Sequence, residues 1–223
     1  MRELASDRPK HLIPVLGRPF ISHLLERLSA AGITRMVLVI GHLKDSWSDF
    51  LRSQPYDLTI VDQFESLGEK YGTACPVEAA ESAIGQESFL AVNGDNLYSA
   101  DDLKNLLVDD GYSYVAGLTH DHPERYGVLV TKPDGRLERI AEKPTEYLGD
   151  LINTGLYKFT PEVFPIVKGL TLSPRNEYEI TDAVSQLAAQ DKVRVYHLQH
   201  YWRDFGRPED VSEMEDFLRG QQI

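Results

Sequence analysis

Two carboxylates stand where an α/β sheet would present them to a ligand. Asp95 lies in the stretch Asn93-Gly94-Asp95-Asn96, directly after the apolar run Phe89–Val92. Open α/β sheets bind ligands outside the carboxyl ends of their strands, and Mg²⁺ prefers one or two carboxylates together with substrate phosphates. Asp204 lies in a second polar stretch, Tyr201–Pro208. Paired with Asp95, it would complete a divalent-cation site suited to phosphoryl chemistry.

Each of these stretches also has an ordinary structural interpretation. Asn-Gly is a strong turn signal, so residues 93–96 can form a simple hairpin, and Asp204 can be a loop or helix-capping residue. The unbroken apolar run before Asn93 favours a buried parallel strand over a hairpin arm. The metal interpretation therefore requires that Asp95 and Asp204 lie together in the fold.

Basic residues that could meet a phosphate occur in three places. They are Lys10 in Arg8-Pro9-Lys10, Lys143 in Ala141-Glu142-Lys143-Pro144, and Arg203 with Arg207. Lys10 precedes an apolar stretch and Lys143 ends a predicted strand, so the backbone would hold both in place. A lysine taken alone is more often a solvated surface charge. These residues therefore indicate a phosphate site only if other site residues lie beside them.

Several common catalytic motifs are absent from the sequence. It contains neither the GxGxxG nor the GxxxxGK[ST] phosphate loop, and neither a serine-hydrolase elbow nor an HExxH zinc motif. The seven histidines are scattered, whereas zinc needs three or four converging ligands. These absences leave carboxylates and lysines as the candidate chemical groups.

The first half of the chain alternates helix and strand patterns. Pro19 and Gly32 delimit a predicted helix over 19–31, and a second helix is predicted over 76–84. A continuous apolar run predicts a strand buried on both faces at Met36–Ile40, and further strands are predicted at Leu58–Val61 and Phe89–Val92. This βαβ order predicts a mainly parallel sheet flanked by helices.

The second half has a different pattern. Short strands are predicted at 114–118, 128–130, 137–140, 153–159 and 193–198, and helices at 161–168, 179–190 and 208–219. The segment 132–136 is a clear hairpin turn. We therefore expect one α/β domain over residues 1–223, with a mixed sheet in its second part. Its two halves would be residues 1–111 and residues 112–223.

Composition excludes several classes of protein. The 223 residues suit one large α/β domain, and a net charge of −12 argues against a nucleic-acid partner. The single Cys75 excludes an internal disulfide framework and fits a reducing compartment. No apolar run approaches the ~18 residues of a membrane span, and the first residues lack the apolar core of a signal peptide. A cytoplasmic protein without a membrane partner is expected; the oligomeric state is not readable from the sequence.

Taken in order, seven segments resemble the sugar-1-phosphate nucleotidyltransferases, also called NDP-sugar pyrophosphorylases, and in particular the glucose-1-phosphate thymidylyltransferases. Each segment alone is weakly informative, but their shared order and approximate spacing extend over nearly the whole chain. The segments are residues 8–19, Gln63 with 71–74, 93–95, 126–128, 142–144, 153–157 and 202–210.

The resemblance implies a role for each matching residue. It implies a nucleotide-binding half over residues 1–111 and a sugar-binding half over residues 112–223. On the nucleotide side, Lys10 would contact phosphates and neutralise charge in the transition state, and the nucleobase pocket would be lined by Gln63, Gly72 and Thr73. Asp95 and Asp204 would hold Mg²⁺. On the sugar side, Lys143 would bind the sugar phosphate, and Gly127 would let the backbone approach the sugar. Glu142 and Asn153 would bind the sugar hydroxyls.

The implied reaction joins a nucleoside triphosphate, with dTTP or UTP favoured, to a hexose 1-phosphate. A sugar-phosphate oxygen would attack the nucleotide α-phosphorus in line and release pyrophosphate. Positioning and charge neutralisation can supply the catalysis without a covalent protein intermediate. The closest alternative is guanylyl transfer to mannose 1-phosphate. A glycosyltransferase of similar topology would usually carry a DxD motif, and Asp95-Asn96-Leu97 does not supply its second aspartate.

One departure from the family concerns its opening strand and its glycine-rich loop with a catalytic arginine. Both would fall ahead of Met1, so the expected fold is a Rossmann-like, mainly parallel sheet without its N-terminal first strand. That strand would lie beside Met36–Ile40 and Phe89–Val92. We therefore expect residues 1–223 alone to be poorly stable and to turn over slowly. A catalytically impaired, regulatory or nucleotide-sugar-binding relative is the remaining alternative.

Overall fold

The computed structural model describes residues 8–41 and 43–221. A short helix η1 (Lys10–Leu12) leads into a hairpin of β1 (Pro14–Val15) and β2 (Arg18–Pro19). Helix α1 (Phe20–Ala30) then begins directly after Pro19 and ends before Gly32, in agreement with the preference of proline for helix starts and glycine for helix ends. The side chains that α1 buries are Phe20, Ile21, His23, Leu24, Leu25 and Leu28.

A pair of parallel strands follows α1. Strand β3 (Arg35–Ile40) pairs along its whole length with β4 (Asp57–Asp62), and η2 (Lys44–Trp47) and α2 (Ser48–Arg52) connect them. The prediction that residues 36–40 are buried on both faces is wrong, because only Met36 is buried and residues 37–40 are half-buried. Within the described ranges β3 has no ladder partner on its other edge, which leaves that edge partly exposed.

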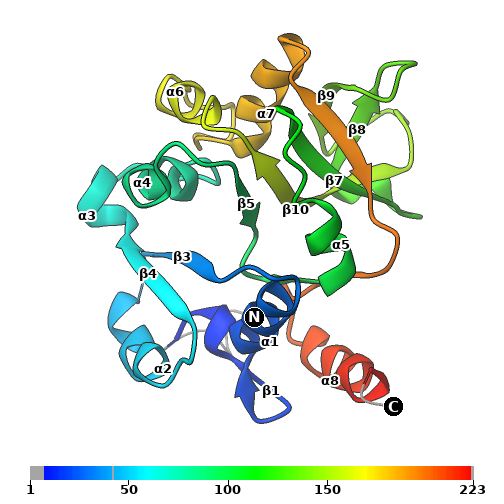
Figure 1. Cartoon of the computed structure of the whole chain (residues 1–223). Helices are drawn as coiled ribbons and strands as arrows, with labels where there is room; N and C mark the ends of the chain where they lie inside the picture. Colours follow the sequence, from blue (N-terminus) through cyan, green and yellow to red (C-terminus); the bar gives the residue numbers. More distant parts are fainter. Residues whose placement is uncertain (1–7, 42, 222–223) are drawn as a thin grey trace.

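The largest sheet has six strands and is centred on β10. This strand is antiparallel to β5, β7 and β8, while β8 forms a hairpin with β9, and β11 runs parallel to β7 (Figure 1). The six strands are β5 (Phe89–Val92), β7 (Ser113–Thr119), β8 (Gly127–Thr131), β9 (Leu137–Glu142), β10 (Leu151–Phe159) and β11 (Val193–His197).

Helices lie on both faces of this sheet. Neighbouring residues of β7, Val115 and Ala116, belong to different apolar clusters, as do Leu156 and Tyr157 of β10, because successive side chains of a strand point to opposite faces. One face is covered by α4 (Cys75–Ile84), α6 (Val163–Lys168) and α7 (Ile180–Ala189). The other packs with α1, α5 (Ala100–Asn105) and α8 (Asp210–Gly220) (Figure 1).

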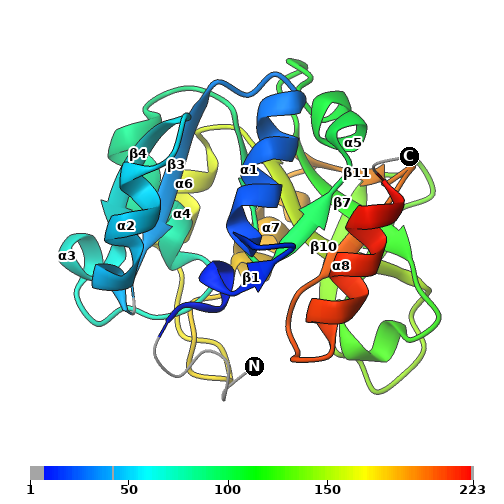
Figure 2. The same ribbon diagram turned by 90° about the horizontal axis from the view of Figure 1, so that it is seen from below.

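The last helix returns to the beginning of the described chain. In Figure 2, α8 lies beside α1 and the β1–β2 hairpin, and the amide of Leu16 donates a 3.0 Å hydrogen bond to the carboxylate of Glu215. The remaining elements are α3 (Gln63–Leu67), η3 (Pro123–Arg125), and the paired short strands β6 (Asn96–Tyr98) and β12 (Trp202–Asp204). In the described part of the chain, no helix is both long enough and apolar enough to span a bilayer.

A buried carboxylate anchors the segment that leads to β12. Asp102, in α5, is fully buried and accepts hydrogen bonds from the Tyr196 hydroxyl at 2.9 Å, the Gln199 amide at 2.9 Å and the His200 amide at 3.1 Å. The Ser99 hydroxyl donates a further bond at 2.7 Å. Four donors on one carboxylate fix where the chain turns from β11 toward β12.

The predicted α/β class is confirmed, with a mixed sheet flanked by helices. The predicted predominance of parallel strands is not found, because parallel pairing is confined, among the residues described, to β3–β4 and β7–β11. The physical reason is that helix and strand stop alternating after β5, and the later strands return as antiparallel neighbours of β10. The prediction of a missing first strand concerns a segment ahead of Met1 and lies outside the described residues.

Candidate active site

Lys10, Asp95 and Asp204 lie together at the end of β5. The turn after β5 carries Asp95 toward β6, whose first residue, Asn96, is paired with Asp204 of β12. The amide of Phe205 donates a 2.9 Å hydrogen bond to the carbonyl oxygen of Asp95, and the Lys10 ammonium forms an ion pair with the Asp95 carboxylate. The fold thus gathers the two predicted metal ligands and the predicted phosphate-binding lysine from distant segments.

Residues 93–96 form a tight turn, but they do not form a hairpin. The amide of Asn96 donates to the carbonyl oxygen of Asn93 over 3.1 Å. The strands on either side of the turn have different partners, since β5 pairs with β10 and β6 pairs with β12. The turn therefore carries the chain from one sheet to another and places Asp95 at the junction.

The charges at this junction oppose one another. The pKa of Asp204 is raised. The first cause is partial desolvation of its carboxyl group by the surrounding protein, and the second is the negative charge of Asp95 and Asp210. Burial lowers the pKa of the neighbouring His11 to about 4, so its ring is neutral near pH 7. That ring packs on the turn, because a Cβ atom at Gly94 would lie 3.1 Å from it.

The donor set at the junction fits Mg²⁺ bound together with a phosphate ligand. Two carboxylates suffice for such an ion when substrate phosphates supply further oxygens, and a cation would relieve the repulsion that raises the pKa of Asp204. Beside them, the Asn96 side chain donates to Asp95 over 3.1 Å, while its own buried oxygen has no hydrogen-bond partner. Across the described ranges, no three His, Cys, Asp or Glu side chains form a metal-binding group, so a purely protein-made cage is not present.

The predicted sugar-side residues form a second group on β8, β9 and β10. Gly127 stands opposite Glu142 in the hairpin, and a Cβ atom at Gly127 would lie 3.0 Å from the Glu142 carboxylate and 3.7 Å from the Asn153 side chain. The Asn153 amide nitrogen donates to the Tyr157 hydroxyl over 2.7 Å, and its oxygen accepts from the Gly155 amide over 3.1 Å. Those bonds hold Asn153 in one orientation beside Glu142.

Arg175 and Glu179 lie beside this group and were not identified from the sequence. The Arg175 guanidinium binds both carboxylate oxygens of Glu179 and lies 3.4 Å from the Glu142 carboxylate. Hydrogen bonds from Arg175 lower the pKa of Glu179, with a further electrostatic contribution from Lys143. The dense charge of residues 175–179 just before the apolar pattern of α7 is the sequence signal that could have indicated them.

Lys143 is held at the end of β9 by an unusual backbone conformation. Its φ is +43°, in the left-handed region that few non-glycine residues adopt. The Lys143 amide donates to the carbonyl oxygen of Tyr126 over 3.0 Å, while its side chain is exposed. Because the backbone is fixed at this point, the exposed side chain of Lys143 begins at a defined position next to Glu142.

The predicted nucleobase residues lie on α3 and on the loop that follows it. Gln63 is buried, and its amide nitrogen donates to the carbonyl oxygen of Lys70 over 3.1 Å. The side-chain oxygen and the second N–H of the amide are what it retains for a ligand. Gly72 and Thr73 lie in the loop against Tyr178 and Ile180, and the Thr73 hydroxyl accepts a 2.9 Å bond from the Ile180 amide. Their role toward a base stays a prediction.

A direct contact connects the metal-side turn with the sugar-side strand. The carbonyl oxygen of Gly155 accepts from the Asn93 amide over 3.0 Å, which joins the Asp95 turn to the bulge that follows Asn153 in β10. Gly155 has a φ of +72°, and a Cβ atom there would overlap the Asn93 side chain. Glycine is therefore required where the metal-side turn meets the sugar-side strand.

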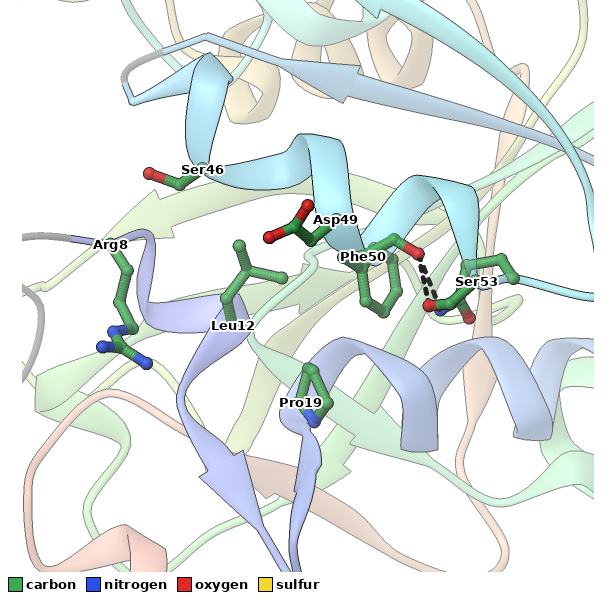
Figure 3. Close-up of a pocket in the computed structure, with 8 residues that line it drawn as sticks. Arg8, Leu12, Pro19, Ser46, Asp49, Phe50 and Ser53 are labelled. Atoms are coloured by element: carbon green, nitrogen blue, oxygen red, sulfur yellow. Dashed lines mark hydrogen bonds between the residues drawn. The ribbon is translucent and has the colours of Figure 1, made fainter.

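A cavity of about 490 Å³ lies between η1 and α2. Figure 3 shows Leu12, Asp49 and Phe50 on its walls, with Arg8 at one end. None of the predicted site residues lines it. The candidate active site is therefore identified by its charged groups and not by the volume of this cavity.

The sequence is similar to those of known proteins. The chain matches the family model described as nucleotidyl transferase over residues 1–221. The UTP--glucose-1-phosphate uridylyltransferase AglF of Haloferax volcanii is 33% identical, over 98% of this chain and 91% of its own length. The bifunctional protein GlmU of Methanocaldococcus jannaschii is 32% identical over 98% of this chain and 51% of its own length. The chain thus spans about half the length of the GlmU relatives that it matches.

The fold is also similar to that of solved structures. A UDP-glucose pyrophosphorylase complexed with UDP-glucose aligns with a TM-score of 0.82 and 24% identity, covering 96% of this chain and 91% of that protein. At this identity the likeness concerns the fold. It agrees with the mixed sheet flanked by helices described above.

Proposed function

Because the chain belongs to the nucleotidyl transferase family, we propose that it transfers a nucleotidyl group from a nucleoside triphosphate to a hexose 1-phosphate. The reaction would depend on Mg²⁺ and yield a nucleoside diphosphate sugar and pyrophosphate. The observation that carries the proposal is the convergence of Lys10 with Asp95 and Asp204. UTP and dTTP are the favoured nucleotides; the name of the Haloferax volcanii relative supports UTP with glucose 1-phosphate.

The proposed reaction is one in-line displacement. An oxygen of the sugar phosphate forms a bond to the α-phosphorus, while the bond from that phosphorus to the bridging oxygen of pyrophosphate breaks. Negative charge builds up on the phosphoryl oxygens and on the leaving group. Positioned cations and fixed dipoles can therefore supply most of the catalysis.

Lys10 and the two aspartates have complementary parts in this proposal. Lys10 brings a positive charge to the junction, where its ion pair with Asp95 holds it now; a triphosphate would compete for that ammonium. Asp95 and Asp204 would hold Mg²⁺, which supplies charge neutralisation at phosphate oxygens. The Asn96 amide, which donates to Asp95, keeps that carboxylate oriented.

The sugar-side group would receive the hexose 1-phosphate. Glu142 and the fixed Asn153 amide offer hydrogen-bonding groups to sugar hydroxyls, and the absence of a side chain at Gly127 lets both side chains pack close to its backbone. Lys143 places its ammonium near the same group, as its influence on the pKa of Glu179 indicates. This arrangement suits a neutral sugar that carries one phosphate.

Release of pyrophosphate tests the proposal. UTP, dTTP and GTP are each combined with glucose 1-phosphate and with mannose 1-phosphate, in Mg²⁺ and again with the metal removed by EDTA. We expect turnover with UTP or dTTP and glucose 1-phosphate, and its loss in EDTA. Turnover restricted to GTP and mannose 1-phosphate would assign guanylyl transfer instead. Calorimetric binding of UDP-glucose with no turnover of any pair would identify a non-catalytic relative.

A further inference from the structure

The loop after α3 is joined to the segment before α7 through their backbones. The amide of Tyr178 donates to the carbonyl oxygen of Tyr71 over 3.0 Å, and the amide of Ala74 donates to that of Tyr178 over 2.9 Å. Between them, Gly72 has a φ of +138°, and a Cβ atom there would overlap the backbone of Tyr178. The nucleotide-side loop and the sugar-side segment therefore form one docked unit.

The side chain of Thr73 completes this docking at the start of α7. The first amides of a helix have no partner within the helix, and Glu179, at the N-cap of α7, supplies no side-chain cap. The Thr73 hydroxyl accepts the hydrogen bond from the Ile180 amide at 2.9 Å. A residue of the other loop thus satisfies the helix terminus.

From this helix start, contacts continue to the sugar side. Glu179, the residue before Ile180, is buried and binds the Arg175 guanidinium through both carboxylate oxygens. The same guanidinium lies 3.4 Å from the Glu142 carboxylate, and Glu142 stands opposite Gly127. A shift of the backbone at 179–180 would therefore move the groups beside Glu142.

We propose that Thr73 is a positioning residue for the sugar phosphate. Its hydroxyl fixes the start of α7, and through Glu179 and Arg175 it sets the charges around Glu142. This inference rests on the proposed function, but it assigns Thr73 a different part from the nucleobase contact that the family resemblance implies. Loss of the hydroxyl then weakens sugar-phosphate binding and leaves nucleotide binding almost unchanged.

The test compares Thr73→Val, which keeps the shape of the side chain but removes the acceptor, with Thr73→Ser, which keeps it. For Thr73→Val we expect the KM for glucose 1-phosphate to rise about fivefold, the change that corresponds to one ordinary hydrogen bond. The kcat and the KM for UTP should stay within about twofold, and Thr73→Ser should restore the wild-type KM. Thr131→Val, at the end of the hairpin away from Gly127, is the matched control.

The outcomes separate this inference from the proposed function. A rise in the KM for UTP alone, or no change in either KM, would overturn the positioning role while leaving the reaction in place. An inactive wild type would count against the proposed function; calorimetric titration of glucose 1-phosphate into wild type and Thr73→Val then decides the positioning role, with equal affinities refuting it. Thermal unfolding of each variant establishes that the compared proteins are folded.

Discussion

At the scale of single residues, the charges around Asp204 oppose the stability of the fold. Its carboxyl group lies near those of Asp95 and Asp210, and its pKa is raised by partial desolvation and by their negative charges. When a carboxyl group has a higher pKa folded than unfolded, raising the pH through that range lowers the free energy of unfolding. Functional sites commonly keep such unfavourable charges.

Asp204→Asn should therefore stabilise the protein and weaken metal binding. In the absence of divalent ions we expect a higher Tm than wild type at pH 8. The difference should diminish as the pH falls and vanish below about pH 3, where Asp204 is protonated in both the folded and the unfolded state. Mn²⁺ affinity, measured by electron paramagnetic resonance, should fall because one carboxylate ligand is lost. Asp216→Asn, on the exposed side of α8, is the control. A lower Tm at pH 8, or unchanged Mn²⁺ affinity, would contradict the assignment.

Lys10→Met tests the positive charge at the same junction. We expect pyrophosphate release to fall by about 10²–10³-fold, the usual effect of removing one group that stabilises transition-state charge. Lys10→Arg keeps the charge and should retain part of the rate. Lys104→Met, on the exposed surface of α5, should leave the rate unchanged; an equal loss in both methionine variants would show that the effect is not specific to the site.

At the scale of elements, the docking of the Gly72 loop depends on the absence of a side chain. Gly68 and Gly72 both have positive φ angles, +64° and +138°, but only Gly72 has the Tyr178 backbone in the path of a Cβ atom. An alanine at Gly68 would be destabilised only by its backbone conformation, which costs about 1–3 kcal/mol. An alanine at Gly72 would in addition push two segments apart.

Gly72→Ala is accordingly expected to lower the free energy of unfolding by about 2–4 kcal/mol, the range for a backbone made incompatible and overpacked at once. Gly68→Ala serves as the matched variant, with a smaller expected loss that comes from its backbone conformation alone. Urea unfolding of both variants measures the difference. Equal losses would mean that the contact with Tyr178 is not a constraint in solution.

Asp102 has a comparable role in the segment between β11 and β12. Burial alone would raise the pKa of its carboxyl group, yet the hydrogen bonds from the Gln199 amide and from the Ser99 and Tyr196 hydroxyls hold it below its usual value. A carboxylate with a lowered pKa stabilises the fold above about pH 4, and that stability is lost as the pH falls through the folded-state pKa.

Asp102→Asn should lower the free energy of unfolding by about 3 kcal/mol at pH 7, because an amide nitrogen would face buried donors. The difference in the free energy of unfolding between Asp102→Asn and wild type should become smaller as the pH falls below about 4. Asp101→Asn, on the neighbouring exposed side chain, is expected to change little. Chemical unfolding at pH 7 and at pH 3.5 measures both; a gap that does not depend on pH would contradict the assignment to an ionised Asp102.

The sequence predicted elements whose signals are local. Helices α1 and α7 were predicted over 19–31 and 179–190, and they end within one residue of those limits, because apolar periodicity marks such helices directly. Strands β6 and β12 were not predicted, since each has three residues and carries polar side chains such as Asn96. The convergence of Asp95 with Asp204 was inferred from a family resemblance. The charge of residues 175–179 is visible in the sequence, but the contact of Arg175 with Glu142 depends on tertiary packing, which the sequence does not show locally.

At the scale of the whole molecule, the two strand systems differ in how well they are paired. Strand β10 has three strand partners and is buried over most of its length. Strand β3 has one partner among the described residues and is mostly half-buried. Local openings release segments with few buried contacts at a lower free energy than global unfolding does.

Hydrogen exchange should show this difference. Amides of β7 and β10 are expected to exchange only through global unfolding, so their rates should follow denaturant with the full m-value. Amides of β3 and β4 should exchange through a smaller opening and with a weaker dependence on denaturant. Mass spectrometry of exchanged peptides at low urea makes the measurement. Equal protection of β3 and β10 would show that the molecule opens as one unit.

The pairing of β6 with β12 also bears on the order of events in folding. The two carboxylates of the candidate site are separated by more than a hundred residues of chain, and contacts between such distant segments are entropically costly to form early. We therefore expect the site to assemble after the rate-limiting step. A nucleotide with its metal ion, bound across this junction, would then slow the unfolding rate and leave the folding rate nearly unchanged. Bound substrate would therefore prolong the lifetime of the folded protein without making it fold faster.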